Sequence, residues 1–321
     1  MKKISVILAA VMAMALLLPG AALAEKKVPV IGIVQLVQHA ALDAAAQGFV
    51  DGLKDQGFVD GENIKIDLQN ANGASDTLAT IADGFVAKKV DMVLAIATKS
   101  AQTMFGKTET IPILGTAITD YVEARLAVSN EEPGFNVSGT TDMNPIEDQI
   151  DLLARIVPEA KKVGLIYTGS EDNSVLQVGI AKKAIEARGL EWTEVKVINS
   201  NDVQQAAQSL VGQCDVLYVP TDNVVASAMP IVAEVMTAAK IPIICGESNM
   251  VDAGGTATLG INYYKLGYQT GLMAVEVLGG ADVSKMPIQR QSEFDYAFNL
   301  EAAAELGLTI PQDLLDQVKA E

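Results

Sequence analysis

Histidine and cysteine are scarce in this 321-residue sequence, which has one histidine, His39, and two cysteines, Cys214 and Cys245. A structural zinc site takes four His or Cys ligands at close spacings, so we predict no metal site. Each cysteine lies in or beside an apolar run, "QCDVLYVP" and "IPIICGE". The sequence leaves open whether the two cysteines form a disulfide or remain as two buried thiols.

Basic residues are also few. Lysine and arginine number 23 against 40 aspartate and glutamate residues, which gives a formal net charge of −17. Such a surface repels the phosphates of nucleic acids and anionic lipids, and this argues against both as partners. The excess of acid is typical of an exported protein that stays soluble at high concentration.

The motifs of common enzyme classes are missing. No G-x-S-x-G elbow marks a nucleophilic serine, and no P-loop or G-x-G-x-x-G follows a predicted strand. The lone His39 therefore has no sequence-marked nucleophile to serve as a base. We interpret the adjacent acids Glu171 and Asp172 as a solvated loop or a helix cap. The sequence predicts no catalytic residue, no cofactor and no enzymatic activity.

The first 24 residues have the pattern of a secretory signal peptide. Lysines at positions 2 and 3 precede an apolar stretch at 4–18, and "AALA" ends at Ala24. This stretch is shorter than the roughly 20 residues that span a bilayer as a helix. We expect cleavage near Ala24 and a soluble mature chain, most simply in a bacterial periplasm.

The rest of the chain alternates short apolar runs with longer amphipathic ones, as in doubly wound α/β folds. The expected strands are 30–36, 64–68, 92–96, 111–114, 137–140, 163–167, 194–197, 216–219, 241–244 and 257–261. The expected helices are 41–56, 75–88, 101–108, 145–156, 174–188, 202–212, 229–239 and 266–278. Most of the strands are continuously apolar and β-branched, which predicts parallel sheets that are covered on both faces.

The same order of elements occurs twice, which predicts two similar lobes. "VDMVLAIAT" and "ETIPILGT" are echoed by "CDVLYVPTD" and "AKIPIICGE" at a spacing of about 130 residues. Residues rich in Gly, Pro and Asp mark three joins, at 142–145, 250–255 and 279–286. We expect a first lobe of residues 25–142 and 256–280, a second lobe of 143–255 and 281–321, and a three-crossing hinge between them.

Short polar loops follow the strands, where open α/β sheets bind their ligands. Ordinary helix capping explains part of this enrichment. Thr98 and Ser100 at a helix start suit a carboxylate, whereas Asp120, Asp222 and Glu247 suit an ammonium group. A zwitterion is the simplest ligand that has both. The candidate ligand-binding residues are Gln35, His39, Thr98, Ser100, Asp120, Ser170, Asn173, Ser174, Asp222, Asn223 and Glu247.

Several stretches together resemble one family over essentially the whole mature chain. They are "QLVQHAALDAAAQGFVDGL", "AIATKSAQ", "AITD", "YTGSEDNSVLQV", "VPTDN", "MVDAGG" and "NLEAAAELGLTIP". The chain resembles type I periplasmic binding proteins and, more narrowly, the tryptophan/tyrosine class of ABC transporter substrate-binding proteins. The resemblance implies a Venus-flytrap mechanism, an aromatic amino acid as ligand and an ABC permease in the inner membrane as partner. We also expect a monomer.

The resemblance also implies two walls for the site. Thr98 and Asp120 would lie on the first lobe, and Ser170, Asn173, Ser174, Asp222 and Asn223 would face them from the second. On physical grounds we place the ligand carboxylate at Thr98, Ser100 and the N–H groups after His39, and the ammonium at Asp222. Two alternatives stay open, namely a binding protein for another small solute and a sensor subunit that presents its ligand to a receptor.

His39 itself has two interpretations. It follows the first predicted strand, in "IVQLVQHAALDAAAQGF", and starts a helix. It has either a purely structural role there or a contact with the polar end of the ligand. In the second case, titration near pH 6–7 would tune binding.

Overall fold

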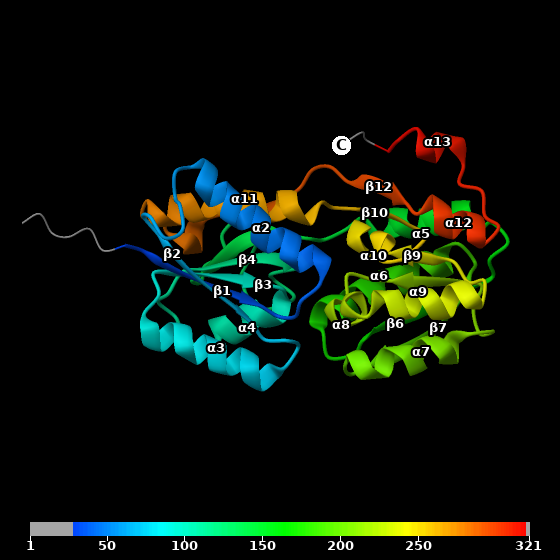
Figure 1. The fold of residues 1–321 in the computed structure, drawn as a ribbon, viewed down its shortest axis with the longest axis horizontal. Coiled ribbons are helices and arrows are strands. Elements are labelled where there is room, and N and C mark those ends of the chain that lie inside the picture. The colour runs from blue at the N-terminus through cyan, green and yellow to red at the C-terminus, as the bar shows by residue number, and fades with distance from the viewer. Residues whose placement is uncertain (1–27, 319–321) are drawn as a thin grey trace, which may run out of the picture.

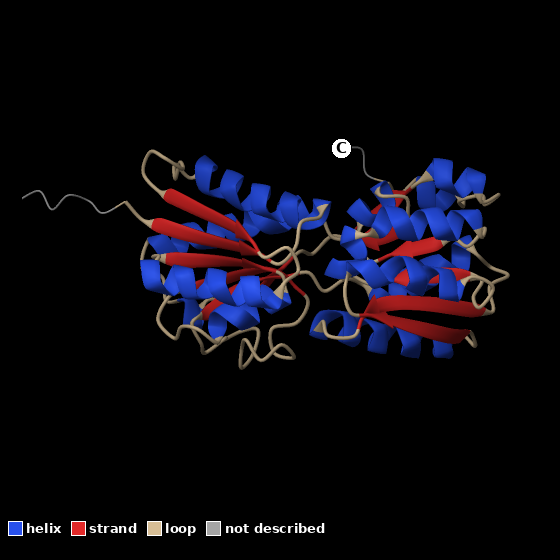
Figure 2. Cartoon of the chain, turned by 60° about the horizontal axis from the view of Figure 1, so that its bottom comes forward, coloured by secondary structure: helices blue, strands red, loops and turns tan. Residues whose placement is uncertain are grey.

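The computed structural model describes residues 28–318 as two α/β lobes (Figure 1). The predicted signal peptide, residues 1–24, lies outside the described residues. Each lobe is built on a sheet of six strands with helices on both faces (Figure 2). The two-lobe, mainly parallel architecture predicted from the sequence is confirmed.

The first lobe has the strand order β11-β5-β4-β3-β1-β2, and all neighbouring pairs are parallel. Strand β3 is buried along its whole length because helices cover both faces of the sheet. Its strands are β1 (Val30–Gln35), β2 (Lys65–Asn70), β3 (Met92–Ile96), β4 (Ile113–Ile118), β5 (Val137–Thr141) and β11 (Gln289–Arg290). Its helices are α2 (Ala40–Asp55), α3 (Ser75–Lys88), α4 (Thr98–Phe105), α11 (Tyr263–Leu278) and the 3₁₀ turn η2 (Val283–Lys285).

The second lobe has the strand order β12-β10-β9-β8-β6-β7, and only β12 runs antiparallel to its neighbour β10. Its strands are β6 (Lys162–Thr168), β7 (Glu191–Val197), β8 (Val216–Val219), β9 (Ile243–Cys245), β10 (Ala257–Gly260) and β12 (Asp295–Phe298). The helices around it are α5 (Ile146–Ile156), α6 (Asp172–Ala187), η1 (Ser200–Asp202), α7 (Val203–Leu210), α8 (Asn223–Ser227), α9 (Met229–Ala238), α10 (Ser248–Asp252), α12 (Leu300–Glu305) and α13 (Gln312–Leu315).

The chain crosses between the lobes three times, but two crossings differ from the expected boundaries. The first follows β5, as expected. Strand β10, which we expected in the first lobe, pairs with β9 of the second sheet, so the second crossing lies between β10 and α11. Strand β11 pairs with β5, so residues 281–290 still belong to the first lobe. The glycine-rich stretches at 254–255 and 279–280 form turns within a lobe and do not mark these crossings.

Helices α2 and α11 lie side by side on the first lobe, although they are more than 200 residues apart in sequence (Figure 1). Glycines make this close approach possible. A Cβ atom on Gly267 would lie 1.9 Å from the carbonyl oxygen of Ala45, and one on Gly48 would lie 2.0 Å from that of Tyr264. Because both helices begin at the junction between the lobes, this contact fixes the relative positions of their first residues.

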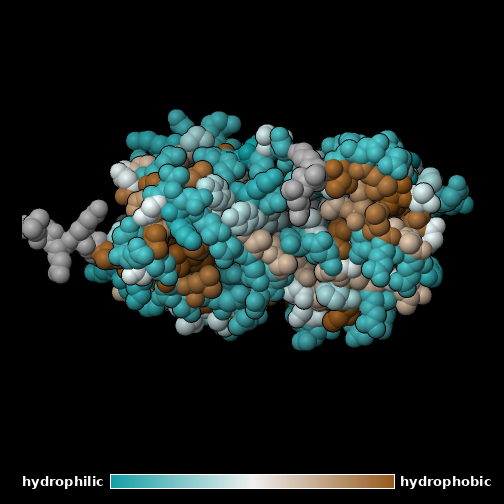
Figure 3. Space-filling view, turned by 45° about the horizontal axis from the view of Figure 1, so that its top comes forward, coloured by the Kyte–Doolittle hydropathy of each residue, from teal (hydrophilic) through white to brown (hydrophobic). Residues whose placement is uncertain are grey.

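The two lobes have separate hydrophobic cores. One core packs around the first sheet and includes Phe49, Phe85 and Leu266, while the second lobe has one apolar cluster on each face of its sheet. Cys214 and Cys245 are both buried and free, so they are two core thiols and do not form a disulfide. Polar residues cover most of the surface in Figure 3, with apolar patches on each lobe. No helix between residues 28 and 318 is long and apolar enough to cross a membrane.

Candidate functional site

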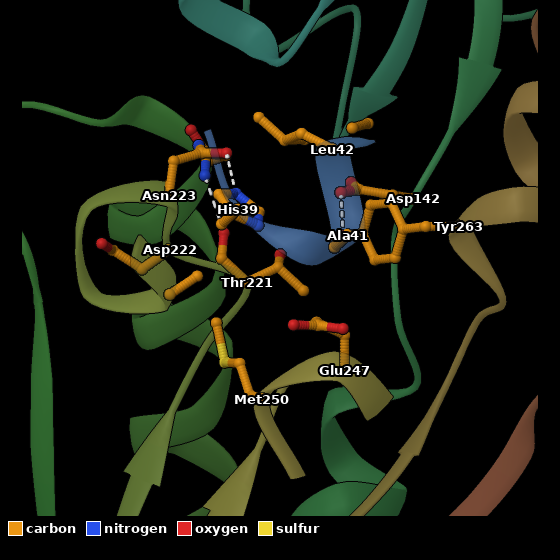
Figure 4. A pocket seen from close by; sticks show the side chains of 13 residues that line it. His39, Ala41, Leu42, Asp142, Thr221, Asp222, Asn223, Glu247, Met250 and Tyr263 are labelled. Atoms are coloured by element: carbon orange, nitrogen blue, oxygen red, sulfur yellow. Dashed lines mark hydrogen bonds between the residues drawn. The ribbon is translucent and has the colours of Figure 1, made fainter. Parts of the chain in front are cut away.

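A small cavity lies between the lobes, at the carboxyl ends of the strands (Figure 4). The start of α2, the ends of β4 and β5 and the start of α11 bring residues from the first lobe. The loops after β8 and β9 and the start of α6 bring residues from the second. The lining residues are His39, Ala41, Leu42, Ala117, Asp142, Asn173, Thr221, Asp222, Asn223, Ala226, Glu247, Met250 and Tyr263.

Three of the lining side chains are carboxylates, and all three are buried. Asp142 follows β5, Asp222 follows β8 and Glu247 follows β9, with exposures of 3%, 0% and 2%. None of the lining residues is a lysine or an arginine. Since a buried negative charge is costly without a positive partner, this cavity favours a ligand with a cationic group.

The carboxylate of Asp222 already has three donors. Its Oδ2 accepts from the backbone N–H of Thr168 at 2.6 Å, and its Oδ1 accepts from the Thr168 hydroxyl and from the N–H of Val225, both at 2.8 Å. The bond from Val225 caps the start of α8. Asp222 therefore holds β6, β8 and α8 together and has little capacity left for a ligand.

Asp142 is less completely bonded. Its Oδ2 accepts from the Tyr263 hydroxyl at 2.7 Å, whereas its Oδ1 has no hydrogen-bond partner within residues 28–318. Burial raises the pKa of Asp142, although the facing hydroxyls of Tyr263 and Thr119 lower it in part. An unpartnered carboxylate oxygen in a closed cavity is a strong acceptor for a ligand donor.

Glu247 combines a structural bond with a cavity-facing group. Its Oε2 accepts from the backbone N–H of Asn249 at 2.6 Å and so caps α10. Figure 4 shows its carboxyl group directed between Thr221 and Tyr263. Burial raises the pKa of Glu247 to about 8, and the charges of Asp252 and Asp142 act in the same direction. A cation near this group would lower its pKa again.

Glu171 lies behind the cavity wall. Of its two predicted roles, the solvated loop is wrong because the residue is buried, while it does occupy the N-cap position of α6, without a side-chain cap bond. Its Oε2 accepts from the backbone N–H and the side-chain amide of Asn223, at 3.2 and 2.6 Å. Burial, together with the charge of Asp222, raises the pKa of Glu171 to about 8. The bond fixes the Asn223 amide so that its oxygen faces the first lobe.

That oxygen meets His39. The Nε2 atom of His39 lies 3.4 Å from Asn223 Oδ1, a contact between the lobes (Figure 4). Because Asn223 presents its oxygen, Nε2 carries the proton and Nδ1 is left as an acceptor. Burial lowers the pKa of His39 to about 4, against the raising effects of Asn223 and Asp43, so the ring is neutral near pH 7. The pKa argues against the predicted titration of His39 near pH 6–7.

Two buried hydroxyls lie at the start of α4. Thr98 Oγ1 and Ser100 Oγ are buried and have no hydrogen-bond partner in the described chain. Neither residue is part of the cavity lining. The preceding residue, Ala97, has a φ of 80°, and Ala117, within the last residues of β4, has a φ of 57°. Left-handed backbone at two alanines is strained, and such strain collects at functional sites.

Five of the eleven predicted site residues line the cavity, namely His39, Asn173, Asp222, Asn223 and Glu247. Ser174 is buried beside them and accepts from the Asn173 amide. The structure places three others elsewhere. The Gln35 amide donates to Val37 and Asp43 at the corner between β1 and α2, Asp120 caps the turn at Val122 and Glu123, and Ser170 is exposed in a turn. Gln35 and Asp120 bond within their own corner or turn, Ser170 faces solvent, and none of the three lines the cavity.

Sequence reasoning missed Asp142, Tyr263 and the apolar lining. Asp142 and Tyr263 follow β5 and β10, so the rule of inspecting strand ends applied to them as well. The sequence pattern marks 142–145 as a join and predicts that the last long helix starts at residue 266, whereas α11 begins at Tyr263. The apolar lining of Leu42, Ala117, Ala226 and Met250 has no sequence signal that distinguishes it from ordinary core.

Known proteins resemble this chain over nearly its full length. The family model described as "ABC transporter substrate binding protein" matches residues 30–320. A tyrosine-binding protein of Clostridioides difficile is 46% identical over 275 residues, 86% of this chain and 80% of that protein. An ABC domain from Streptococcus pneumonia, solved in complex with L-Trp, has a TM-score of 0.88 at 36% identity and covers 90% of this chain and 98% of its own.

A third structure shows which state of the lobes is present here. The ligand-free, open structure of a substrate-binding protein with adhesive properties from Clostridium difficile is 46% identical and covers 91% of this chain and 98% of its own, but its TM-score is only 0.69. The L-Trp complex has lower identity and a higher score, so the lobes of this structure are arranged more as in that complex than as in the open structure, with hydrogen bonds from His39 to Asn223 and from Gln177 to Thr119 between them. With its type I periplasmic binding protein fold, the chain belongs to the ABC transporter substrate-binding protein family.

Proposed function

We propose that this protein captures an aromatic amino acid, tyrosine or a close relative, between its lobes and delivers it to an ABC permease. The observation that carries the proposal is the cavity between the lobes, where three carboxylates meet an apolar wall and no basic side chain. The tyrosine-binding relative and the L-Trp complex support the aromatic side chain of the ligand.

The ligand ammonium would lie between Asp142 and Glu247. Asp142 Oδ1 has no partner in residues 28–318, and Glu247 is bonded through one oxygen only. We prefer this pair to Asp222, our assignment from the sequence, because the carboxylate of Asp222 already accepts three hydrogen bonds. Charge-assisted hydrogen bonds to a buried ammonium are worth about 1.5–3 kcal/mol each.

The ligand carboxylate would lie at the starts of α2 and α4. The first N–H groups of a helix have no intrahelical acceptor, and the helix dipole favours an anion there. Strands β1 and β3 are neighbours in the sheet, so the two helices that follow them begin at the same edge of the sheet, on its opposite faces. The free hydroxyls of Thr98 and Ser100 would add donors at the same place.

The aromatic ring would lie against the apolar lining. Leu42 and Met250 come from opposite lobes, and Met250 offers a polarizable thioether to a ring. The ring of Tyr263 is buried at the cavity wall. The small side chains of Ala117 and Ala226 leave room between these residues.

Export would place this protein in the periplasm, where it can deliver its ligand to a permease. The predicted signal peptide at residues 1–24 would direct the protein to the periplasm, where it would act as a soluble monomer. Membership of the family supports a permease as the partner.

Isothermal titration calorimetry of the mature chain tests the proposal. L-tyrosine, L-tryptophan or L-phenylalanine should bind, while 3-(4-hydroxyphenyl)propionate, which lacks the ammonium, should bind at least about 10-fold more weakly than tyrosine. Tyramine, which lacks the carboxylate, tests the helix N-termini in the same way. Equal binding of tyrosine and the ammonium-free analogue, or saturable binding of a sugar alone, would contradict the proposal.

A further inference from the structure

The side chain of His39 makes a single hydrogen bond in the described chain, and this bond crosses between the lobes. Its Nε2 lies 3.4 Å from Asn223 Oδ1 of the second lobe. His39 occupies the N-cap position of α2, but its side chain does not cap that helix. The ring therefore has no hydrogen bond within its own lobe. The start of α2 alone does not explain its position.

Bonds within the second lobe decide which ring nitrogen of His39 carries the proton. Asn223 donates to Glu171 Oε2 through both its backbone N–H and its Nδ2. Its Oδ1 is thereby turned toward His39, and an amide oxygen can only accept. In the neutral ring Nε2 is then the donor. Nδ1 is left as an acceptor that has no hydrogen-bond partner in residues 28–318.

This free acceptor belongs to a side chain of the cavity wall. His39 lines the cavity together with Asp142 and Glu247. In Figure 4 one ring nitrogen is directed toward Asn223 and the other toward the space that the labelled side chains enclose. Burial lowers the pKa of His39 to about 4, so the ring is neutral near pH 7 and does not repel a cation.

A primary ammonium has three N–H donors, and the two carboxylates proposed to bind it can accept two of them. Asp142 offers Oδ1, which has no partner in the described chain, and Glu247 offers the oxygen that does not cap α10. The neutral Nδ1 of His39 can accept the third N–H without adding buried negative charge. All three groups line one small cavity.

We propose that His39 binds the ligand as a neutral acceptor, with Nδ1 receiving one N–H of the ammonium. The assignment rests on the function proposed above, because it takes the ligand to carry a primary ammonium. Nε2 bonds to the second lobe at the same time. One imidazole ring thus joins recognition of the ligand to a contact between the lobes.

A comparison of two ligands in two forms of the protein tests this bond. L-tyrosine carries the ammonium, and 3-(4-hydroxyphenyl)propionate lacks it. His39→Phe keeps an aromatic ring but removes both ring nitrogens. The Kd of tyrosine should rise about 10-fold more than the Kd of the analogue, because only tyrosine loses a charge-assisted hydrogen bond at Nδ1. Calorimetric titration at pH 8, above the ordinary imidazole pKa of about 6.5, keeps His39 neutral throughout.

A second variant, His39→Gln, keeps the bond between the lobes. Its amide can donate to Asn223, but it carries no acceptor at the place of Nδ1. It should show the same difference of about 10-fold between the two ligands, while the Kd of the analogue stays within about 2-fold of the wild-type value.

The comparison separates ligand binding from folding and from closure. The His39 side chain has no hydrogen bond within the first lobe, so neither variant breaks one there. A loss of stability, or of the bond to Asn223, changes both Kd values by the same factor and cancels in their ratio. Gln102→Met is the matched control, because Gln102 donates to Asp172 Oδ2 across the lobes at 2.9 Å but does not line the cavity. It should leave the ratio of the two Kd values unchanged.

Nuclear magnetic resonance reads the ring directly, because His39 is the only histidine of the sequence. In the tyrosine complex at pH 8, a ¹H–¹⁵N correlation should place the proton on Nε2. The Nδ1 signal should differ between the tyrosine complex and the complex with the analogue, since only tyrosine donates to it.

The outcomes separate the two proposals. If the wild-type protein binds no aromatic amino acid, the proposed function fails, and the role of His39 fails with it. If it binds tyrosine more tightly than the analogue and both His39 variants keep the wild-type ratio of Kd values, only the role of His39 is overturned. A proton on Nδ1 in the tyrosine complex would overturn that role as well.

Discussion

Asp142 and Asp222 are both buried carboxylates of the cavity, but they differ in how many hydrogen bonds their neighbours donate to them. Three donors bond to Asp222 and engage both of its oxygens, and one of them caps α8. Asp142 keeps one oxygen without a partner in the described chain. At the scale of single residues, the number of satisfied lone pairs separates a structural carboxylate from one that is ready for a ligand.

This difference predicts opposite effects of the same substitution. Asp142→Asn should weaken tyrosine binding by about 1.5–3 kcal/mol, because it removes the charge that faces the ammonium. Its effect on unfolding should be small, since an ionised Asp142 is costly to bury. Asp222→Asn should instead lower the free energy of unfolding by about 1–3 kcal/mol, because the amide nitrogen that replaces one carboxylate oxygen cannot accept, and at least one of the donors of Thr168 and Val225 loses its acceptor. Calorimetric titration and urea denaturation measure the two effects, and an equal loss of affinity in both variants would contradict the assignment.

The raised pKa of Glu247 predicts how the stability of the protein and its affinity for tyrosine depend on pH. Burial raises its pKa from 4.5 to about 8. The folded protein therefore holds a proton that the unfolded chain releases above about pH 4.5, so this contribution to stability is lost as pH rises toward 8. An ammonium at the site would expel that proton, so tyrosine affinity should increase between about pH 6 and pH 8.

Calorimetry in two buffers with different ionisation enthalpies measures the released protons directly. Glu247→Gln should release fewer protons and show a flatter decline of stability with pH. His39→Gln tests the other candidate source of a pH dependence, whose pKa burial lowers to about 4 in this arrangement of the lobes. A pH dependence of tyrosine affinity that disappears in His39→Gln and persists in Glu247→Gln would contradict this assignment.

At the scale of elements, the packing of α2 on α11 positions two cavity residues. His39 precedes α2 and Tyr263 begins α11. Glycines allow the two backbones to touch, as Gly267 shows against Ala45. A side chain at this contact would separate the helices and move both cavity residues.

Gly267→Ala should therefore lower the free energy of unfolding by about 1–3 kcal/mol and weaken tyrosine binding as well. Gly84 is the matched control, because it also lies inside a helix but a Cβ there would meet no atom within 4 Å. Gly84→Ala should stabilise the protein by about 0.5–1 kcal/mol. Chemical denaturation of both variants checks the pair, and similar effects would show that the contact between α2 and α11 is not tight.

The elements that the sequence predicted well are those with the strongest patterns. Strand β3 and helix α3 begin and end where we expected, because an apolar run and an amphipathic repeat define them without interruption. The sequence does not predict the edge strands β11 and β12. They have two and four residues, which is too short for a repeating pattern of apolar and polar residues. The short helices α8 and α10 were missed because they span only five residues each.

At the scale of the whole molecule, internal duplication predicted two lobes, but no local pattern could place the second and third crossings. A crossing is defined by which sheet a strand joins, and β10 and β11 join their sheets through long-range pairing. Composition marks a turn equally well within a lobe and between lobes. For the same reason, the sequence pattern places Asp142 in a join and not in the site.

The closed arrangement leads to a prediction for the ligand-free protein. The contacts between the lobes that involve His39, Gln102 and Gln177 are few hydrogen bonds, and each is worth only about 0.5–1.5 kcal/mol net. Closure without ligand also brings Asp142 and Glu247 together with no cation between them. The ligand-free protein should therefore be mainly open in solution and should close when tyrosine neutralises this pair.

Small-angle X-ray scattering measures this change as a decrease in the radius of gyration when tyrosine is added. Asp142→Asn should be less dependent on ligand for closure, because it removes one of the charges that oppose it, yet it should bind tyrosine more weakly. These two effects together distinguish charge repulsion from a hinge that is intrinsically open. A ligand-free protein that already has the compact radius, with no change on adding tyrosine, would show that the contacts between the lobes suffice to close it and that the carboxylates do not hold it open.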